Sequence, residues 1–136
     1  MKYLIVDDDR LCRVLLENML SEFGHGDVAS SGVEAIGAFV LALDDGEPYD
    51  LICMDIMMPG SDGHRTLEAI RAVERQRGIH GSDGVKVIMT TALSDSKHCI
   101  RAFHEGCESY VTKPLDEEVL LGAMRELGLR LEPANR

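Results

Sequence analysis

Five short apolar runs alternate along this chain with longer amphipathic segments, and few folds accommodate that alternation. The runs predict strands at residues 3–6, 26–30, 51–55, 85–90 and 109–112. The third run, Leu-Ile-Cys-Met, is continuously apolar, which is typical of a strand buried on both faces. Strands that alternate with helices favour a parallel sheet with helices on both sides. The expected fold is therefore a doubly wound α/β domain.

Capping residues at the start and, in most cases, glycines at the end predict five helices in the remaining segments. They cover about residues 10–23, 32–43, 62–77, 95–105 and the stretch after Pro114 that ends at Gly128. Asp9, Ser31 and Asp116 are the expected caps of the first, second and fifth helices. We expect one domain over residues 1–128. The tail at 129–136 is too short to be an output domain.

Composition excludes several classes of function. The 136 residues are enough for one hydrophobic core, and the net charge of −10 should repel nucleic acids. No apolar run approaches the ~20 residues of a membrane helix, so we expect no membrane insertion. The four cysteines lack the spacing of metal ligands. Unpaired cysteines of this kind indicate a reducing compartment, and the expected location is the cytoplasm.

Polar residues stand at the carboxyl ends of four predicted strands. They are Asp7, Asp8, Asp55, Thr90, Thr91 and Lys113. The carboxyl ends of parallel strands meet at one edge of the sheet, where such folds bind ligands. Crowded carboxylates repel one another and attract Mg²⁺, a hard cation that prefers oxygen ligands. Lysine and threonine can hold phosphoryl oxygens, and a carboxylate can form an aspartyl phosphate, so the edge is suited to phosphoryl transfer.

These residues lie in motifs that resemble those of response-regulator receiver domains from two-component signalling. The motifs are Leu4-Ile5-Val6-Asp7-Asp8-Asp9, Asp55-Ile56-Met57-Met58-Pro59-Gly60 with Asp62-Gly63, Thr91-Ala92, and Lys113-Pro114. They occur in the order and at about the spacing of that family, over residues 2–128. The resemblance implies a flavodoxin-like sheet with strand order 2-1-3-4-5 and five helices, in a receiver of the stand-alone type.

The resemblance also implies a role for each site residue. Asp55 matches the phosphoacceptor, with Thr91 and Lys113 as the residues that contact its phosphate. Mg²⁺ is expected on Asp7, Asp8, Asp55 and the backbone carbonyl of Met57. Thr91 and Tyr110 match the two switch residues, and Pro114 matches a proline that follows a cis peptide bond after Lys113.

The implied function is a phosphorylation-dependent switch rather than an enzyme, beyond self-phosphorylation from small donors and self-dephosphorylation. A histidine kinase or histidine-phosphotransfer protein would supply the phosphoryl group. The fourth helix, fifth strand and fifth helix would then change and control an unidentified protein target. Segments 32–48 and 78–84 are longer than is usual in the family, and we expect them at the rim opposite the site.

Two other functions fit parts of the pattern. A haloacid-dehalogenase-like phosphatase would use Asp7 as its nucleophile, because Asp7 and Asp9 form the D-x-D motif of that class. Leu11 stands where that class prefers threonine, and no acidic strand end follows Lys113. A flavin-binding flavodoxin would need a phosphate loop rich in glycine and hydroxyl groups after the first strand, where three acidic residues stand instead.

Overall fold

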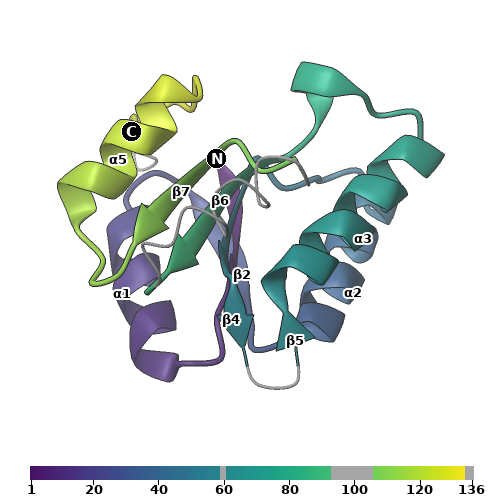
Figure 1. Cartoon of the computed structure of the whole chain (residues 1–136). Coiled ribbons are helices and arrows are strands. Elements are labelled where there is room, and N and C mark those ends of the chain that lie inside the picture. The colour runs from purple at the N-terminus through teal and green to yellow at the C-terminus, as the bar shows by residue number, and fades with distance from the viewer. Residues whose placement is uncertain (59–60, 93–105, 134–136) are drawn as a thin grey trace.

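The computed structural model describes residues 1–58, 61–92 and 106–133, and its centre is a five-stranded parallel sheet (Figure 1). The strands are β1 (Lys2–Val6), β2 (His25–Ala29), β3 (Leu51–Asp55), β6 (Lys86–Thr91) and β7 (Ser109–Thr112). Their order in the sheet is β2-β1-β3-β6-β7. In chain order this is the predicted 2-1-3-4-5 arrangement, so the flavodoxin-like fold is confirmed. The fourth strand was expected at 85–90 and instead runs one residue later, so that Thr91, expected just past it, forms its last residue.

Four of the five predicted helices lie within the described residues. They are α1 (Arg10–Leu20), α2 (Gly32–Asp44), α3 (Gly63–Gln76) and α5 (Glu117–Glu126), and a 3-10 turn, η1, covers Gly81–Asp83. Asp9, Ser31 and Asp116 each accept a backbone N–H as N-caps, as predicted. The helix expected at 95–105 lies outside the described residues. No helix in the described part of the chain combines the length and the apolar character needed to cross a bilayer.

A short antiparallel hairpin between β3 and α3 was not predicted. It pairs β4 (Met57–Met58) with β5 (Ser61–Asp62), which places Met57 opposite Asp62. Asp62 was expected to be the first residue of the helix. It is instead the N-cap, and its side chain accepts the His64 N–H at 2.8 Å. The hairpin therefore carries the chain from the phosphoacceptor candidate Asp55 directly into α3.

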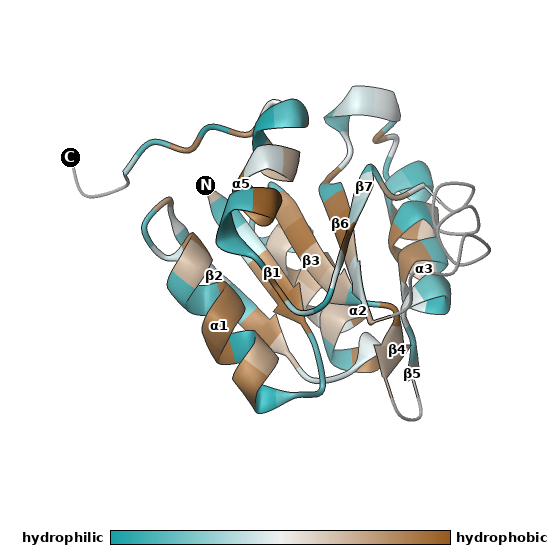
Figure 2. Ribbon diagram, turned by 60° about the vertical axis from the view of Figure 1, so that its left-hand side comes forward, coloured by the Kyte–Doolittle hydropathy of each residue, from teal (hydrophilic) through white to brown (hydrophobic). Residues whose placement is uncertain are grey.

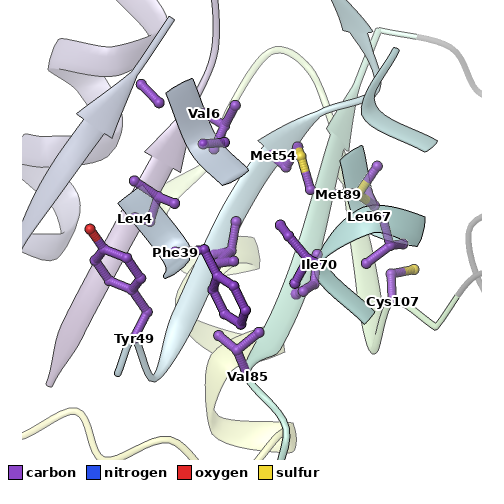
Figure 3. Packing of buried hydrophobic residues seen from close by; sticks show 14 of the residues in the cluster. Leu4, Val6, Phe39, Tyr49, Met54, Leu67, Ile70, Val85, Met89 and Cys107 are labelled. Carbon is purple, nitrogen blue, oxygen red and sulfur yellow. The ribbon is translucent and has the colours of Figure 1, made fainter. Parts of the chain in front are cut away.

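Helices cover both sides of the sheet (Figure 1). One side, here called the α2/α3 face, packs Phe39, Leu67 and Ile70 of the helices against alternate strand residues such as Met54 and Met89 (Figure 3). The opposite side, the α1/α5 face, packs residues of α1 and α5 against the strand residues between them. Its buried members include Ile5, Leu16, Leu20, Cys53, Ile88, Val111, Leu120 and Met124. Two covered faces explain the continuously apolar third strand.

Two details of the α1/α5 face bear on sequence expectations. Burial raises the pKa of the Cys53 thiol to about 12, so this cysteine remains a protonated core residue. Leu129 and Leu131 pack against the same core, although residues 129–136 were expected to be a tail outside the domain. The described start of that tail thus contributes to the fold.

The end of the first longer segment and the second longer segment lie at the amino ends of β3 and β6, as predicted. The start of the first segment does not, because Gly32 lines a cavity with Ile56 and Met57 next to Asp55. Pro48 and Ser82, one from each segment, line a common cavity of about 270 Å³. Tyr49, which follows the first segment, is buried, and its hydroxyl donates to Asp27 Oδ2 at 2.5 Å. Lys2 Nζ donates to the carbonyl of Glu47 at 2.7 Å. These contacts tie the long α2–β3 connection to the first two strands.

We predict that Tyr49→Phe lowers the free energy of unfolding by about 1 kcal/mol, because it leaves Asp27 without its hydroxyl donor. Chemical denaturation would measure the change. Tyr3→Phe is the matched control, since Tyr3 is also buried, and its hydroxyl donates to none of the described residues. Equal losses in the two variants would contradict the role assigned to the Tyr49–Asp27 bond.

Candidate functional site

Three carboxylates gather at the carboxyl edge of the sheet. Asp7 directly follows β1, Asp55 ends β3, and Asp8 is the next residue after Asp7. One carboxylate oxygen from each of the three residues lies within 4.8 Å of those from the other two. Asp7 is completely buried and Asp55 is 5% exposed, whereas Asp8 is exposed. The structure brings these three side chains together, as the sequence predicted, and Asp8 is the one that faces solvent.

Lys113 joins the two buried carboxylates. Its Nζ donates to Asp7 Oδ2 at 3.0 Å and to Asp55 Oδ2 at 3.2 Å. Lys113 follows the edge strand β7, and its backbone N–H donates to the Thr91 carbonyl at 2.7 Å. The peptide bond between Lys113 and Pro114 is cis, as predicted. The single ammonium thus bridges residues that come from β1 and β3.

Backbone hydrogen bonds fix the other oxygen of each buried carboxylate. The Asp9 N–H donates to Asp7 Oδ1 at 2.9 Å, and the Met57 N–H donates to Asp55 Oδ1 at 3.1 Å. Arg13, from the first turn of α1, donates from Nη1 to the backbone carbonyl of Asp7 at 2.8 Å. Sequence reasoning missed Arg13, because an arginine in an amphipathic helix normally indicates only a solvated face.

Acidic groups outnumber basic ones at this site. Burial raises the pKa of Asp55, and the charge of Asp7 raises it further, while Lys113 and the Met57 N–H oppose the shift. Burial alone would lower the pKa of Lys113. The hydrogen bond to Asp7 and the charges of Asp55 and Asp7 outweigh that effect and raise it above its ordinary value. Lys113 is therefore a fixed ammonium bonded to two of the three carboxylates.

This donor set fits a hard divalent cation. All three side chains offer oxygen, the exposed Asp8 leaves room for water, and one ammonium does not neutralise the group. Mg²⁺ favours such sites, because it takes one or two carboxylates and retains several waters. Within residues 1–58, 61–92 and 106–133, no second cluster of three acidic, histidine or cysteine side chains could hold a metal ion.

The two expected switch residues share one face of the sheet. Thr91 is completely buried at the end of β6, and Tyr110 lies on the neighbouring β7 with 37% of its surface exposed. Side chains alternate along a strand. Met89 belongs to the α2/α3 face, so Thr91 points to that face too, and Tyr110 does so because Val111 points to the other. Thr91 is two residues beyond Met89, the strand partner of Tyr110, so the two side chains lie near each other on this face.

One family model matches most of the chain. The family model described as the response regulator receiver domain matches residues 3–125. The regulatory protein VanRB of Enterococcus faecalis is 32% identical over 124 residues, which are 91% of this chain and 50% of VanRB. The sensor histidine kinase GacS of Pseudomonas protegens is 34% identical over 88% of this chain and 12% of its own length. The chain thus spans half or less of these curated relatives.

Solved structures agree with the sequence matches. One is the co-crystal structure of the Saccharomyces cerevisiae histidine phosphotransfer signaling protein Ypd1 with the receiver domain of Ssk1. Its match has 26% identity, covers 94% of this chain and 88% of that one, and has a TM-score of 0.79. The BeF3-activated DrrB receiver domain matches with 26% identity, coverage of 95% and 97%, and a TM-score of 0.73. The comparisons give no support to the phosphatase alternative.

Proposed function

This chain belongs to the response-regulator receiver domains, and we propose that it is a switch phosphorylated on Asp55. The observation that carries the proposal is the position of Asp55. It is a buried carboxylate on the central strand, bonded to Lys113 and clustered with Asp7 and Asp8. Treatment with acetyl phosphate, followed by borohydride trapping and mass spectrometry, would locate the label.

Asp55 is better placed than Asp7 to be the nucleophile. Asp7 has no exposed surface, its Oδ1 accepts the Asp9 N–H, and its backbone carbonyl accepts from Arg13. Asp55 retains 5% exposure, and among the described residues only Lys113 is bonded to its Oδ2. A phosphoryl donor must reach the attacking oxygen in line with the leaving group. The remaining access at Asp55 favours it as the acceptor.

The expected reaction is a simple displacement. An oxygen of Asp55 attacks the phosphorus of a phosphohistidine, a C–O–P linkage forms, and the P–N bond breaks with a proton returning to the imidazole. Lys113 turns from the carboxylates to a phosphoryl oxygen, and the Thr91 hydroxyl donates to another. Asp7, Asp8, Asp55 and the Met57 carbonyl would hold Mg²⁺, which neutralises phosphoryl charge when bound.

Phosphorylation is proposed to act through Thr91 and Tyr110, whose side chains both point to the α2/α3 face. Movement of the Thr91 hydroxyl toward the phosphate vacates space, and the half-exposed Tyr110 ring turns into it. Reversing such an equilibrium from 1:99 to 99:1 takes about 5.5 kcal/mol of differential binding. A lysine ion pair and a threonine hydrogen bond would supply part of this. The output surface would include β7 and α5, together with the helix expected at 95–105, which lies outside the described residues.

The partner that supplies phosphate is proposed to dock on α1. This helix begins three residues after Asp7, and it exposes Leu11 at 65%, Val14 at 42% and Leu15 at 41%. Residues spaced by three and four share one side of a helix, so the three form an apolar stripe on α1. Figure 2 shows that several turns of α1 are hydrophobic. A receiver similar to this one has been crystallised with a histidine phosphotransfer protein. The proposed occupant is accordingly the phosphohistidine-bearing helix of such a donor.

We predict that Leu11→Glu slows phosphoryl transfer from the donor protein at least about tenfold, because a buried apolar contact is replaced by a charge. Labelling by acetyl phosphate should stay unchanged, since a small donor does not need α1. Both rates can be measured with radiolabelled phosphate, using a histidine kinase or phosphotransfer protein that labels the wild type.

The matched control is Leu41→Glu. Leu41 is 60% exposed on α2, away from the stripe on α1. An equal loss of transfer in both variants would argue against docking on α1. Loss of acetyl phosphate labelling in Leu11→Glu would show that the substitution damages the site itself.

A further inference from the structure

Thr90 is a buried residue with a hydroxyl group at the carboxyl end of β6. The residue is 1% exposed, and its Oγ1 has no hydrogen-bond partner in the described part of the chain. Leaving a buried hydroxyl unbonded destabilises a protein by roughly 1–3 kcal/mol. Valine would fill the same space without that cost. A hydroxyl at this position is therefore expected to find its partner in another state of the molecule.

Thr90 stands beside the phosphoacceptor candidate. The two residues are direct partners in the pairing of β3 with β6. Ile88 lies in the α1/α5 face, so Thr90, two residues on, points to that face. Cys53 lies in the same face, so Asp55 points there as well. Neighbouring strands are about 4.8 Å apart, which places the Thr90 side chain next to the Asp55 carboxylate.

Lys113 reaches the carboxylates across the strand that carries Thr90. Because β6 lies between β3 and β7, the Lys113 side chain must cross the end of β6 to reach Asp55 and Asp7. In this structure Lys113 supplies the donor for Asp55 Oδ2. During phosphoryl transfer the Lys113 ammonium bonds a phosphoryl oxygen instead of the carboxylates. A buried carboxylate oxygen then loses its donor at the moment when its orientation matters most.

Resting on Asp55 as the phosphoacceptor, we propose that Thr90 is a positioning residue for this carboxylate. As Lys113 turns to the phosphoryl group, the Thr90 hydroxyl rotates and donates to the Asp55 oxygen that Lys113 releases. The Met57 N–H holds the carboxylate from the other side. This role differs from that of Thr91, which points to the α2/α3 face.

The test compares Thr90→Val with Thr90→Ser. Thr90→Val keeps the shape and removes the hydroxyl, so the rate of labelling at saturating acetyl phosphate with Mg²⁺ should fall about tenfold, the effect of one hydrogen bond to a charged group. The half-saturating acetyl phosphate concentration should not change. Thr90→Ser keeps the hydroxyl and should restore the rate to within about threefold. The unphosphorylated Thr90→Val protein should melt at or above the wild-type temperature.

Thr66→Val is the matched control. Thr66 is also buried, and its Oγ1 donates to the Asp62 carbonyl at 3.2 Å, outside the acidic cluster. This variant should melt lower than the wild type and label at the wild-type rate. Wild-type labelling rates in Thr90→Val, or equal slowing in Thr90→Ser, would overturn the role of Thr90. Labelling of a residue other than Asp55 in the wild type would overturn the proposed function instead.

Discussion

Asp55→Asn should abolish phosphorylation by acetyl phosphate, with labelling reduced at least about a thousandfold. The amide has nearly the shape of the carboxylate but cannot attack phosphorus, so the loss comes from removal of the nucleophile. The fold should survive. Burial raises the pKa of Asp55 more than Lys113 lowers it, and the charge of Asp7 adds to the increase, so the ionised group is disfavoured at this position. A neutral amide therefore removes a repulsion, and the free energy of unfolding should not fall by more than about 1 kcal/mol.

Labelling can be followed by borohydride trapping and mass spectrometry, and folding by circular dichroism. Asp9→Asn is the matched control, because Asp9 is an exposed acid of the loop between β1 and α1, next to Asp7 and Asp8, and caps α1, a role that asparagine also fills. It should label normally. A label on Asp7 of the wild type would contradict the assignment and would favour the phosphatase mechanism that the acidic triplet also permits.

The convergence of the site was predictable because the sheet is parallel. Asp7, Asp55 and Lys113 are more than a hundred residues apart at their extremes, yet each ends or follows a strand, and parallel strands end at one edge. The apolar runs predict where the strands end, and the strand ends predict where these three residues lie. The strand order came from the family resemblance, since the alternation of elements alone does not determine it.

Other features depend on contacts that no local pattern encodes. The strands of the β4–β5 hairpin have two residues each, too few for any periodicity.

Glu74 is an acid on an amphipathic helix, where a solvated face is the ordinary expectation. It is nevertheless 4% exposed, because it pairs with Arg71 at 2.6 Å and accepts the Val85 N–H at 2.8 Å. Arg71 also bonds Glu108, which accepts the Val87 N–H.

The idle hydroxyl of Thr90 could not have been found in the sequence either. A threonine at the end of a strand is a common β former, and its neighbour Thr91 matches the family motif. The role proposed for Thr90 rests on two structural facts. Its side chain points to the α1/α5 face, and its Oγ1 has no partner among the described residues.

Removal of Mg²⁺ should have an effect nearly as large as removal of the nucleophile. Three carboxylates oppose one ammonium at the edge of the sheet, so a phosphoryl group that carries negative charge is repelled unless a cation is present. We expect labelling by acetyl phosphate in EDTA to fall at least about a hundredfold. Labelling that proceeds in EDTA would contradict the metal site.

Binding of Mg²⁺ to the folded protein alone also stabilises it by mass action, by about 1.4 kcal/mol at ten times the dissociation constant. Sodium chloride at equal ionic strength is the control, because general screening would act with either salt. Asp8→Asn tests whether Asp8 is a Mg²⁺ ligand without disturbing the fold. Asp8 is exposed, so its amide variant should unfold like the wild type without metal but gain less stability from Mg²⁺ and label more slowly. If Asp8→Asn gains as much stability from Mg²⁺ as the wild type, then Asp8 is not a ligand, and the two buried carboxylates alone hold the ion.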